Sequence, residues 1–545
     1  MLATEWSEVS PLADLLVRSA ATHPDRSALV MPGLALTYAE LYEASTEIAR
    51  GILGLGLSAR AKVGILANNS RELVTALFGT ALANCVAVPL NARHKSLELG
   101  YIIENADLAL ILTTAADTRY VDFREVLTNA LPSLAASSAD APLSLAEAPL
   151  LRAIVVLEGD APAGFMTRSA LIEAAHSVPF ARVDAARRAT RLRDTALIIY
   201  TSGTTANPKG CLLSHEAVTR GPVERAGRRF RAREHDVTWG GGPLFHIGSL
   251  APFIGVIGTG GTYVTDVMFD AGRALELMER ERVSVAWPWF PAILQPLLDH
   301  PEFHPGRLAA LRKVLLIAPP ALVDRAQRTF PKAEFMQACG MTETAGIFAL
   351  CSPDETPEQR TVSQGKAVPG VEVKIVDPDS GVELAANQVG EILVRGYCVM
   401  DGYHRSPEKT AEALDGEGWL HTGDLYARAP DGQLSFHGRA KDMLKVGGEN
   451  VAAIEVEAYL CGHPAVKLAE VVGRPDPRLD EVPVAFVELR PGCNASEAEL
   501  IAFCQGQIAS YKVPRAVLFV SDGEWPMSAT KVDKRVLRAR LQSGG

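Results

Sequence analysis

The hydrophobic positions in the first third of the chain alternate between short apolar runs and longer stretches with helical spacing. The short runs predict buried strands, and the stretches with apolar residues three and four apart predict helices. Strands that alternate with helices favour a mostly parallel, layered α/β sheet. The predicted strands are Ser27–Val30, Val63–Leu66 and Val86–Leu90, and the predicted helices are Pro11–Ala21, Tyr38–Leu55 and Glu72–Ala83.

An uncharged stretch of nineteen residues runs from Ile247 to Thr265. Its length would suit a membrane span, but it contains five glycines and is interrupted by Pro252. We interpret it as a buried helix, a glycine turn and a strand, and we predict no membrane span.

The pattern changes between Val362 and Gly438 to short β segments separated by turn residues, which predicts a small β-barrel or sheet. The rest of the chain shows βαβ-like runs and is long enough for a domain of its own. At 545 residues the whole chain is too long for one core. We therefore predict an α/β protein with a large N-terminal domain of layered sheets plus the barrel-like part (1–438) and a smaller, mobile α+β C-terminal domain (439–545).

The composition is typical of a globular protein, with 48% hydrophobic and 22% charged residues. The net charge of −10 argues against a nucleic-acid-binding scaffold. Eight cysteines occur without a CxxC pair, which indicates reduced thiols. Residues 1–5 have neither the basic nor the apolar part of an export signal, so we expect a cytoplasmic protein.

Two segments are rich in arginine: residues 182–193 contain five and residues 220–233 contain six. A basic strip could attract an anionic cofactor or substrate. The pattern favours a solvated helix face for both segments.

The densest group of candidate chemical residues follows the apolar run Leu197–Tyr200. These residues suit a loop that closes over a polyphosphate, because four hydroxyls can donate to phosphate oxygens, glycine permits close approach and Lys209 adds positive charge. It is not a Walker loop, since the order here is Lys209-Gly210-Cys211. An ordinary polar turn between two strands is the alternative. The loop residues are Thr201, Ser202, Gly203, Thr204 and Thr205.

Five further segments follow in order: Gln337–Glu343, Trp419–Asp424, Gly438-Arg439, Lys445–Asn450 and Pro526–Lys531. Together with the loop they resemble the adenylate-forming superfamily, which includes acyl-CoA synthetases, firefly luciferase and the adenylation domains of peptide synthetases. The resemblance is strongest to bacterial acyl- or aryl-CoA ligases, and the residues that support this are Pro243–Ile247, Gly447–Asn450 and Ser510–Arg515.

The resemblance implies ATP-dependent activation of a small carboxylic acid. A carboxylate oxygen attacks the α-phosphorus of ATP, pyrophosphate leaves, and the thiol of coenzyme A then opens the acyl-adenylate. This chemistry needs positive charge and hydrogen-bond donors around the phosphorus. The implied catalytic residues are Lys209, His246, Thr342, Glu343 and Lys531, and the implied hinge is Lys441.

The resemblance also implies three sets of binding residues. The nucleotide would contact the loop 201–205 and Lys209, Ala318, Gln337, Ala338, Cys339, Thr342, Asp424, Arg439 and Lys531. Mg²⁺ would be held by Glu343 and Thr204, and coenzyme A would contact Gly447, Gly448, Glu449, Tyr511 and Lys512. Trp287, Trp289 and Phe290 could line the acyl pocket, although core packing explains them equally well.

Three departures from the family pattern stand out. Cys339 occupies the position where most members stack an aromatic residue on adenine, Ala318-Pro319-Pro320 replaces a glycine-containing strand end, and Ala206 replaces a common glycine. Two alternatives stay open: an acyl-AMP ligase that loads a carrier protein, and a nucleotide-binding regulatory protein with degraded catalysis. The pattern suits aromatic, medium-chain and ring-bearing acids equally, and a homodimer is an open option.

Overall fold

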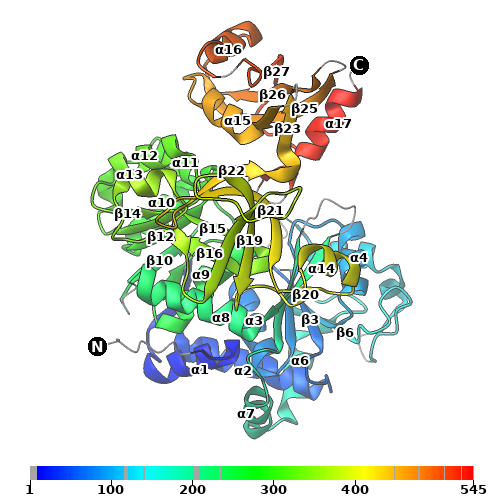
Figure 1. Ribbon diagram of the computed structural model, residues 1–545. Coiled ribbons are helices and arrows are strands. Elements are labelled where there is room, and N and C mark those ends of the chain that lie inside the picture. Colours follow the sequence, from blue (N-terminus) through cyan, green and yellow to red (C-terminus); the bar gives the residue numbers. More distant parts are fainter. Residues whose placement is uncertain are drawn as a thin grey trace.

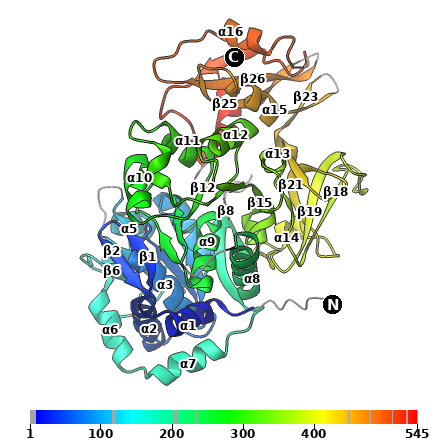
Figure 2. The same ribbon diagram turned by 90° about the vertical axis from the view of Figure 1, so that its left-hand side faces the viewer.

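A computed structural model describes residues 9–115, 121–138, 141–201, 208–231, 235–446, 449–476, 479–508, 510–528 and 531–543. Figures 1 and 2 show a large body that contains the chain up to β22 (Leu434–Arg439) and a small unit formed by the remaining residues. The predicted α/β fold with a smaller α+β C-terminal unit is confirmed.

An eight-stranded sheet forms one layer of the body. Its central strands are parallel, while the hairpin β8–β9 and the short β20 pair antiparallel at one edge. The strand order is β20 (Gly402–Tyr403), β9 (Lys209–Ser214), β8 (Thr195–Thr201), β4 (Val86–Pro89), β3 (Lys62–Leu66), β5 (Leu108–Thr114), β6 (Ala153–Glu158) and β7 (Met166–Thr167).

A seven-stranded sheet forms the second layer, and all its pairs are parallel except β1 with β2. The order is β14 (Glu334–Met336), β13 (Lys313–Leu316), β12 (Val285–Trp289), β10 (Val237–Gly240), β11 (Thr262–Val264), β1 (Ser27–Met31) and β2 (Leu34–Thr37).

Five helices, together with Leu171 and Val183 from two others, share one hydrophobic core with strands of both sheets, and the five gather in the lower half of Figure 1. The second begins at a capping box formed by Thr37 and Glu40, and the last ends at Gly260, whose φ of 72° suits glycine. The helices and strands predicted for the first third of the chain and for 247–265 are confirmed. The five helices are α1 (Leu12–Thr22), α2 (Tyr38–Gly54), α3 (Arg71–Leu82), α8 (His215–Glu224) and α9 (Ile247–Thr259).

Along the chain, the other helices of the body lie between strands. Across all described residues, no helix is long and apolar enough to cross a membrane. These helices are α4 (Ser96–Asn105), α5 (Phe123–Ala130), α6 (Arg168–His176), α7 (Phe180–Arg188), α10 (Ala271–Arg280), α11 (Pro291–Asp299), α12 (Pro320–Thr329), α13 (Pro357–Val362) and α14 (Pro407–Ala413).

The predicted β-rich segment 362–438 takes the sheet form of the two that were predicted, and its strands belong to two antiparallel sheets, one of which begins before Val362. The two remain separate because the two-residue strand β17 pairs only with β16 and not with β18. The sheets are β15 (Ala338–Met341), β16 (Gly346–Leu350) and β17 (Lys366–Ala367), and β18 (Val371–Val376), β19 (Val389–Gly396), β21 (Leu420–Arg428) and β22.

The C-terminal unit has its own hydrophobic cores, which contain no residue before Leu444. The predicted run at Ile454–Leu460 is a helix, and the runs at Leu468–Val472 and Val484–Leu489 are strands. The elements are β23 (Met443–Val446), β24 (Glu449–Ala452), α15 (Ala453–Cys461), β25 (Val466–Asp476), β26 (Asp480–Leu489), α16 (Glu497–Cys504), β27 (Ala516–Phe519), β28 (Met527–Ser528), β29 (Lys531–Val532) and α17 (Lys534–Ser543).

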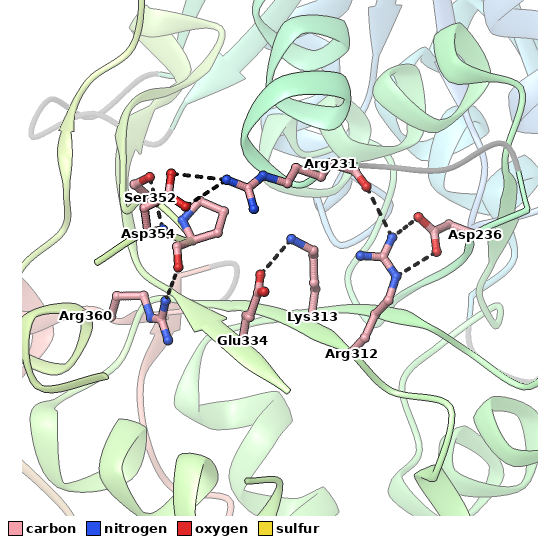
Figure 3. Close-up of polar contacts among 9 residues, drawn as sticks. Arg231, Asp236, Arg312, Lys313, Glu334, Ser352, Asp354 and Arg360 are labelled. Carbon is pink, nitrogen blue, oxygen red and sulfur yellow. Dashed lines mark hydrogen bonds and ion pairs between the residues drawn. The ribbon is translucent and has the colours of Figure 1, made fainter. Parts of the chain in front are cut away.

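A cluster of ion pairs lies at the amino ends of β10, β13 and β14 (Figure 3). Arg312 pairs with Asp236, and the Lys313 ammonium lies 2.7 Å from Glu334. Burial lowers the pKa of Lys313 even beside this carboxylate. The cluster stabilises the edge of the sheet opposite to the one where the candidate site residues lie.

The arginine-rich segment 220–233 is not a solvated face throughout, so that prediction is wrong for one of its residues. Helix α8 continues into a π-helix, Arg225–Arg229, and the Arg225 side chain is only 4% exposed. It is buried because α8 packs closely against α9, where a Cβ on Gly255 would lie 2.9 Å from the Pro222 carbonyl oxygen.

Candidate active site

The parallel strands of the seven-stranded sheet bring several predicted residues to one edge. Strands β12, β13 and β14 end at Trp289, Leu316 and Met336, so Phe290, Ala318 and Gln337 follow at their carboxyl ends. The Ala318 backbone N–H donates to the Gln337 side-chain oxygen at 3.4 Å. Ligands of open α/β sheets bind at this edge.

Gln337 anchors the start of the β15–β16 hairpin. Its side chain is 1% exposed, and its amide donates to the carbonyl oxygens of Arg360 and Thr361 at 3.1 and 2.8 Å. It therefore fixes the backbone of Ala338 and Cys339. The Cys339 side chain is buried, and burial raises the pKa of its thiol, with the neighbouring Tyr426 acting in the opposite direction.

Thr342 and Glu343 lie in the short 3-10 turn Thr342–Thr344 that follows β15. The turn ends at Ala345 with a φ of 48°, a conformation that L-residues rarely adopt. The Thr344 hydroxyl donates to the Gly346 carbonyl oxygen at 2.6 Å and holds this bend. The Glu343 side chain is 9% exposed.

Lys209 and Glu343 meet through Tyr403, a residue that the sequence analysis missed. The Tyr403 hydroxyl donates to Glu343 Oε1 at 2.9 Å, and Lys209 Nζ lies 4.3 Å from the centroid of the Tyr403 ring. Burial and the Glu343 charge raise the pKa of Tyr403, so its hydroxyl stays a donor. Gly402, directly before Tyr403 in β20, has a φ of 140°, a conformation that favours glycine.

Asp424 and Arg439 face each other across β21 and β22. Arg439 Nε lies 3.1 Å from Asp424 Oδ1. The Thr422 hydroxyl accepts the Asp424 backbone N–H at 3.1 Å, which fixes the turn at Gly423. The structure thus brings together two of the residues that the sequence analysis assigned to the nucleotide.

His246 immediately precedes α9. Its Nε2 is buried without a hydrogen-bond partner among the described residues. Burial, reinforced by the nearby Arg93 and His94, lowers the pKa of His246 to about 4. The ring is therefore neutral near pH 7 and can accept or donate a hydrogen bond to a ligand.

Lys531 lies in the C-terminal unit, yet its ammonium is 5.7 Å from the centroid of the Phe290 ring in the body. Phe290 directly follows β12, so the predicted catalytic lysine reaches the edge where Ala318 and Gln337 lie. Lys534, three residues later in the chain, pairs instead with Glu457 and Glu470 inside the C-terminal unit.

The residues predicted to contact coenzyme A lie in the C-terminal unit. Tyr511 packs against its core, and the Lys512 ammonium lies 2.6 Å from Glu455 near the start of α15. Lys441 lies in the 3-10 turn Ala440–Asp442, and Glu449 begins β24. The predictions for Ser202, Gly203, Thr204, Thr205, Gly447 and Gly448 fall outside the described residues.

The residues around Glu343 suit a magnesium ion that also binds a nucleotide. The described residues hold no group of three carboxylate, histidine or cysteine side chains that could form an all-protein metal site. Glu343 offers one carboxylate, of which Oε1 already accepts from Tyr403. Mg²⁺ commonly takes one or two carboxylates and completes its shell with phosphate and water oxygens.

The family model of the AMP-binding enzymes matches residues 16–404, and that of the AMP-binding enzyme C-terminal domain matches residues 455–531. The first match alone spans more than half of the chain, so the chain belongs to the AMP-binding enzyme family. The prediction of an adenylate-forming, AMP-dependent acyl-CoA synthetase or ligase is confirmed.

Similarity to individual proteins extends over nearly the whole chain. YngI of Bacillus subtilis is 30% identical over 540 residues, 97% of each chain. The mitochondrial medium-chain acyl-CoA ligase of Homo sapiens is 28% identical, over 95% of this chain and 85% of its own. The crystal structure of the anthranilate CoA ligase AuaEII with anthranoyl-AMP has a TM-score of 0.84 at 27% identity, over 100% of this chain and 99% of that one. ATP-bound MatB from Rhodopseudomonas palustris has a TM-score of 0.82 at 26% identity, over 97% and 99%.

Proposed function

We propose that this protein is an acid–thiol ligase that activates a carboxylic acid with ATP as an acyl-adenylate and then transfers the acyl group to coenzyme A. The observation that supports this best is the cluster of Lys209, Tyr403 and Glu343. It combines a cation, a neutral donor and a carboxylate beside the turn that contains Thr342. The relatives named as CoA ligases favour coenzyme A over a carrier protein, and they also argue against a degraded regulatory protein.

We propose the following division of roles during adenylation. Lys209 stabilises the leaving pyrophosphate, Thr342 donates to the α-phosphate, and Lys531 neutralises the charge between the attacking carboxylate and the phosphorus. Asp424 accepts from the ribose hydroxyls while Arg439 holds its carboxylate in place. Glu343, fixed by Tyr403, would hold Mg²⁺, which would supply positive charge for the phosphates.

The second step needs a different arrangement, because the thiol must reach a carbonyl beside which Lys531 lies during the first step. We propose that the C-terminal domain, residues 439–545, rotates about Lys441 and brings Gly447, Gly448, Glu449, Tyr511 and Lys512 to coenzyme A. A cytoplasmic location and a homodimer remain predictions.

The test is acid-dependent release of pyrophosphate, followed by detection of the thioester. A panel of acids from acetate to long-chain and aryl acids is supplied with ATP, Mg²⁺ and either coenzyme A or a phosphopantetheinylated carrier protein. We expect at least one acid to give pyrophosphate, AMP and an acyl-CoA. Pyrophosphate release with no acid of the panel would refute the ligase function, and acylation of the carrier alone would refute coenzyme A as the acceptor.

A further inference from the structure

Trp289 has an unusual backbone conformation for a residue with a large side chain. It is the last residue of β12, and its φ is 57°, in a region that bulky L-residues seldom adopt. The Phe290 N–H donates to the Pro288 carbonyl oxygen at 2.7 Å, so Trp289 is the central residue of a three-residue γ-turn. The form of this turn with a positive φ is rare and strained.

Backbone contacts with the neighbouring strand β13 hold this strained turn in place. The Trp289 carbonyl oxygen accepts the Ile317 N–H at 2.6 Å, and the pairing of β12 with β13 shifts register between Ala286 and Trp289. A strained residue persists only where its surroundings fix it, and such residues cluster at functional sites. The strain therefore marks Trp289 as a candidate functional residue.

The Trp289 side chain has a second unfavourable feature. It is 5% exposed, and its indole Nε1 is buried without a hydrogen-bond partner among the described residues. Buried polar atoms are nearly always paired in proteins, and an exception needs an explanation. A phenylalanine ring would fill much of the same space without an unpaired donor. Strain and an unpaired N–H at one residue indicate that the indole is kept for its function and not for stability.

The indole lies between the first turn of α9 and the residues around Lys531. A Cβ on Gly248 would lie 3.8 Å from Trp289 Cε2, and Gly248 is the second residue of α9, directly after His246 and Ile247. On its other side the Trp289 ring lies 6.3 Å from the Phe290 ring, centroid to centroid. The Lys531 ammonium lies 5.7 Å from the centroid of that same Phe290 ring.

The hairpin that carries Thr342 packs on the same turn of α9. A Cβ on Gly346, the first residue of β16, would lie 3.8 Å from Ile247 Cγ1. The start of α9 therefore lies against both Trp289 and this hairpin. An acid whose carboxyl group is activated between Lys531 and Thr342 has the first turn of α9 and the Trp289 indole beside its tail.

We propose that Trp289 determines the substrate class by closing the acid site, so that the substrate is a compact carboxylic acid with a short tail. This inference rests on the proposed function and names its substrate class. The γ-turn holds the indole against the first turn of α9, where a longer tail would collide with it. Glycine adopts a positive φ without strain, so Trp289→Gly removes the indole and keeps the turn.

The experiment compares each acid that the wild-type enzyme accepts with its homologue lengthened by a butyl group at the end farthest from the carboxyl group, such as butanoate with octanoate and benzoate with 4-butylbenzoate. Acid-dependent pyrophosphate release by the full-length enzyme gives kcat/KM for each acid. We expect the wild-type kcat/KM to be lower for the lengthened acid by on the order of 10- to 100-fold. Trp289→Gly should raise kcat/KM for the lengthened acid by on the order of 10-fold, mainly through KM, without raising it for the short one.

Trp239→Phe is the matched control, because it changes another buried indole of the same sheet. Trp239 lies in β10, is 1% exposed, and belongs to a different hydrophobic core from Trp289. This change should lower the unfolding temperature and leave the ratio of kcat/KM between short and lengthened acids intact. If Trp289→Gly does not fold, Trp289→Phe keeps a smaller ring and should shift that ratio in the same direction by a smaller factor.

The possible failures are distinguishable. A wild-type kcat/KM that is equal or higher for the lengthened acid, or the same ratio in the wild-type and Trp289 variant enzymes, would overturn the inference and leave the indole as a core side chain. The ligase function would then still stand, because the accepted acid releases pyrophosphate. Pyrophosphate release with no acid at all would instead contradict the proposed function itself.

Discussion

Replacing Tyr403 by phenylalanine removes one hydroxyl and keeps the ring, which separates two contacts of the candidate site. The hydroxyl donates to Glu343 Oε1 at 2.9 Å, and both side chains are buried, at 8% and 9% exposure. A hydrogen bond to a charged group contributes about 1.5–3 kcal/mol. At about 1.4 kcal/mol per tenfold change in rate, Tyr403→Phe should slow adenylation by about 10- to 100-fold.

The retained ring still contacts Lys209 at 4.3 Å. Tyr403→Leu removes that contact too, and since a cation–π contact contributes about 0.5–2 kcal/mol, it should be slower than the phenylalanine variant by a further factor of roughly 2 to 30. The assay is acid-dependent exchange of pyrophosphate into ATP, with thioester formation from supplied acyl-adenylate as the second readout. The second rate should be unchanged, because Glu343 acts on the phosphates of the first step.

Tyr38→Phe is the control for a buried tyrosine hydroxyl far from the site. Tyr38 is 0% exposed and its hydroxyl donates to the Gly261 carbonyl oxygen at 2.7 Å. We expect it to lower the unfolding temperature without slowing exchange. Exchange within twofold of wild type in Tyr403→Phe, or an equal loss in both half-reactions, would refute the role of the Tyr403–Glu343 contact.

Three further predictions concern single side chains. Lys209→Ala should slow pyrophosphate exchange strongly with the fold intact, and an unchanged exchange rate would contradict its role at the leaving group. Lys531→Ala should cripple adenylation but spare thioester formation from supplied acyl-adenylate, whereas Lys441→Pro should do the reverse because a fixed φ blocks rotation; a normal thioester step in the latter would disprove the hinge. Burial and the neighbouring Glu457 raise the pKa of Glu470 from 4.5 to about 7, so its contribution to stability is present at low pH and is lost as the pH rises through that range. Glu470→Gln should flatten this loss in urea denaturation between about pH 5 and pH 8, and identical slopes in both proteins would contradict it.

Local sequence patterns were sufficient for most elements of the fold. The spacing of apolar residues in α2 and the capping pair Thr37 and Glu40 are properties of a short segment, so they can be recognised without the rest of the chain. The uncharged stretch 247–265 was correctly predicted as a helix, a turn and a strand because glycine and proline mark its interruption. The choice between a barrel and a sheet for residues 362–438 stayed open in the sequence because pairing between distant strands decides closure.

The residues that the sequence analysis missed or misplaced depend on contacts between distant segments. Tyr403 meets Glu343 across 60 positions of the chain, and nothing near Tyr403 indicates that partner. Arg225 lies among other arginines, where the local pattern favours a solvated face. It is buried because α8 packs on α9 and Gly221 leaves it space, and neither cause can be read from a charge count.

The two lysines near the chain end show how burial separates a structural role from a catalytic one. Lys534 pairs with Glu457 and lies 3.4 Å from Glu470, and its side chain is 15% exposed. Moving it to the nucleotide would leave two buried carboxylates without their cation, which is a strongly unfavourable change. Lys531 lies in the β28–β29 hairpin, three residues earlier, and already reaches Phe290 in the body. In the proposed rotation of the C-terminal domain, Lys531 would move to and from the phosphorus while Lys534 stays paired inside that domain. The β28–β29 hairpin would then act in the first step and leave the acyl carbonyl open to the thiol in the second.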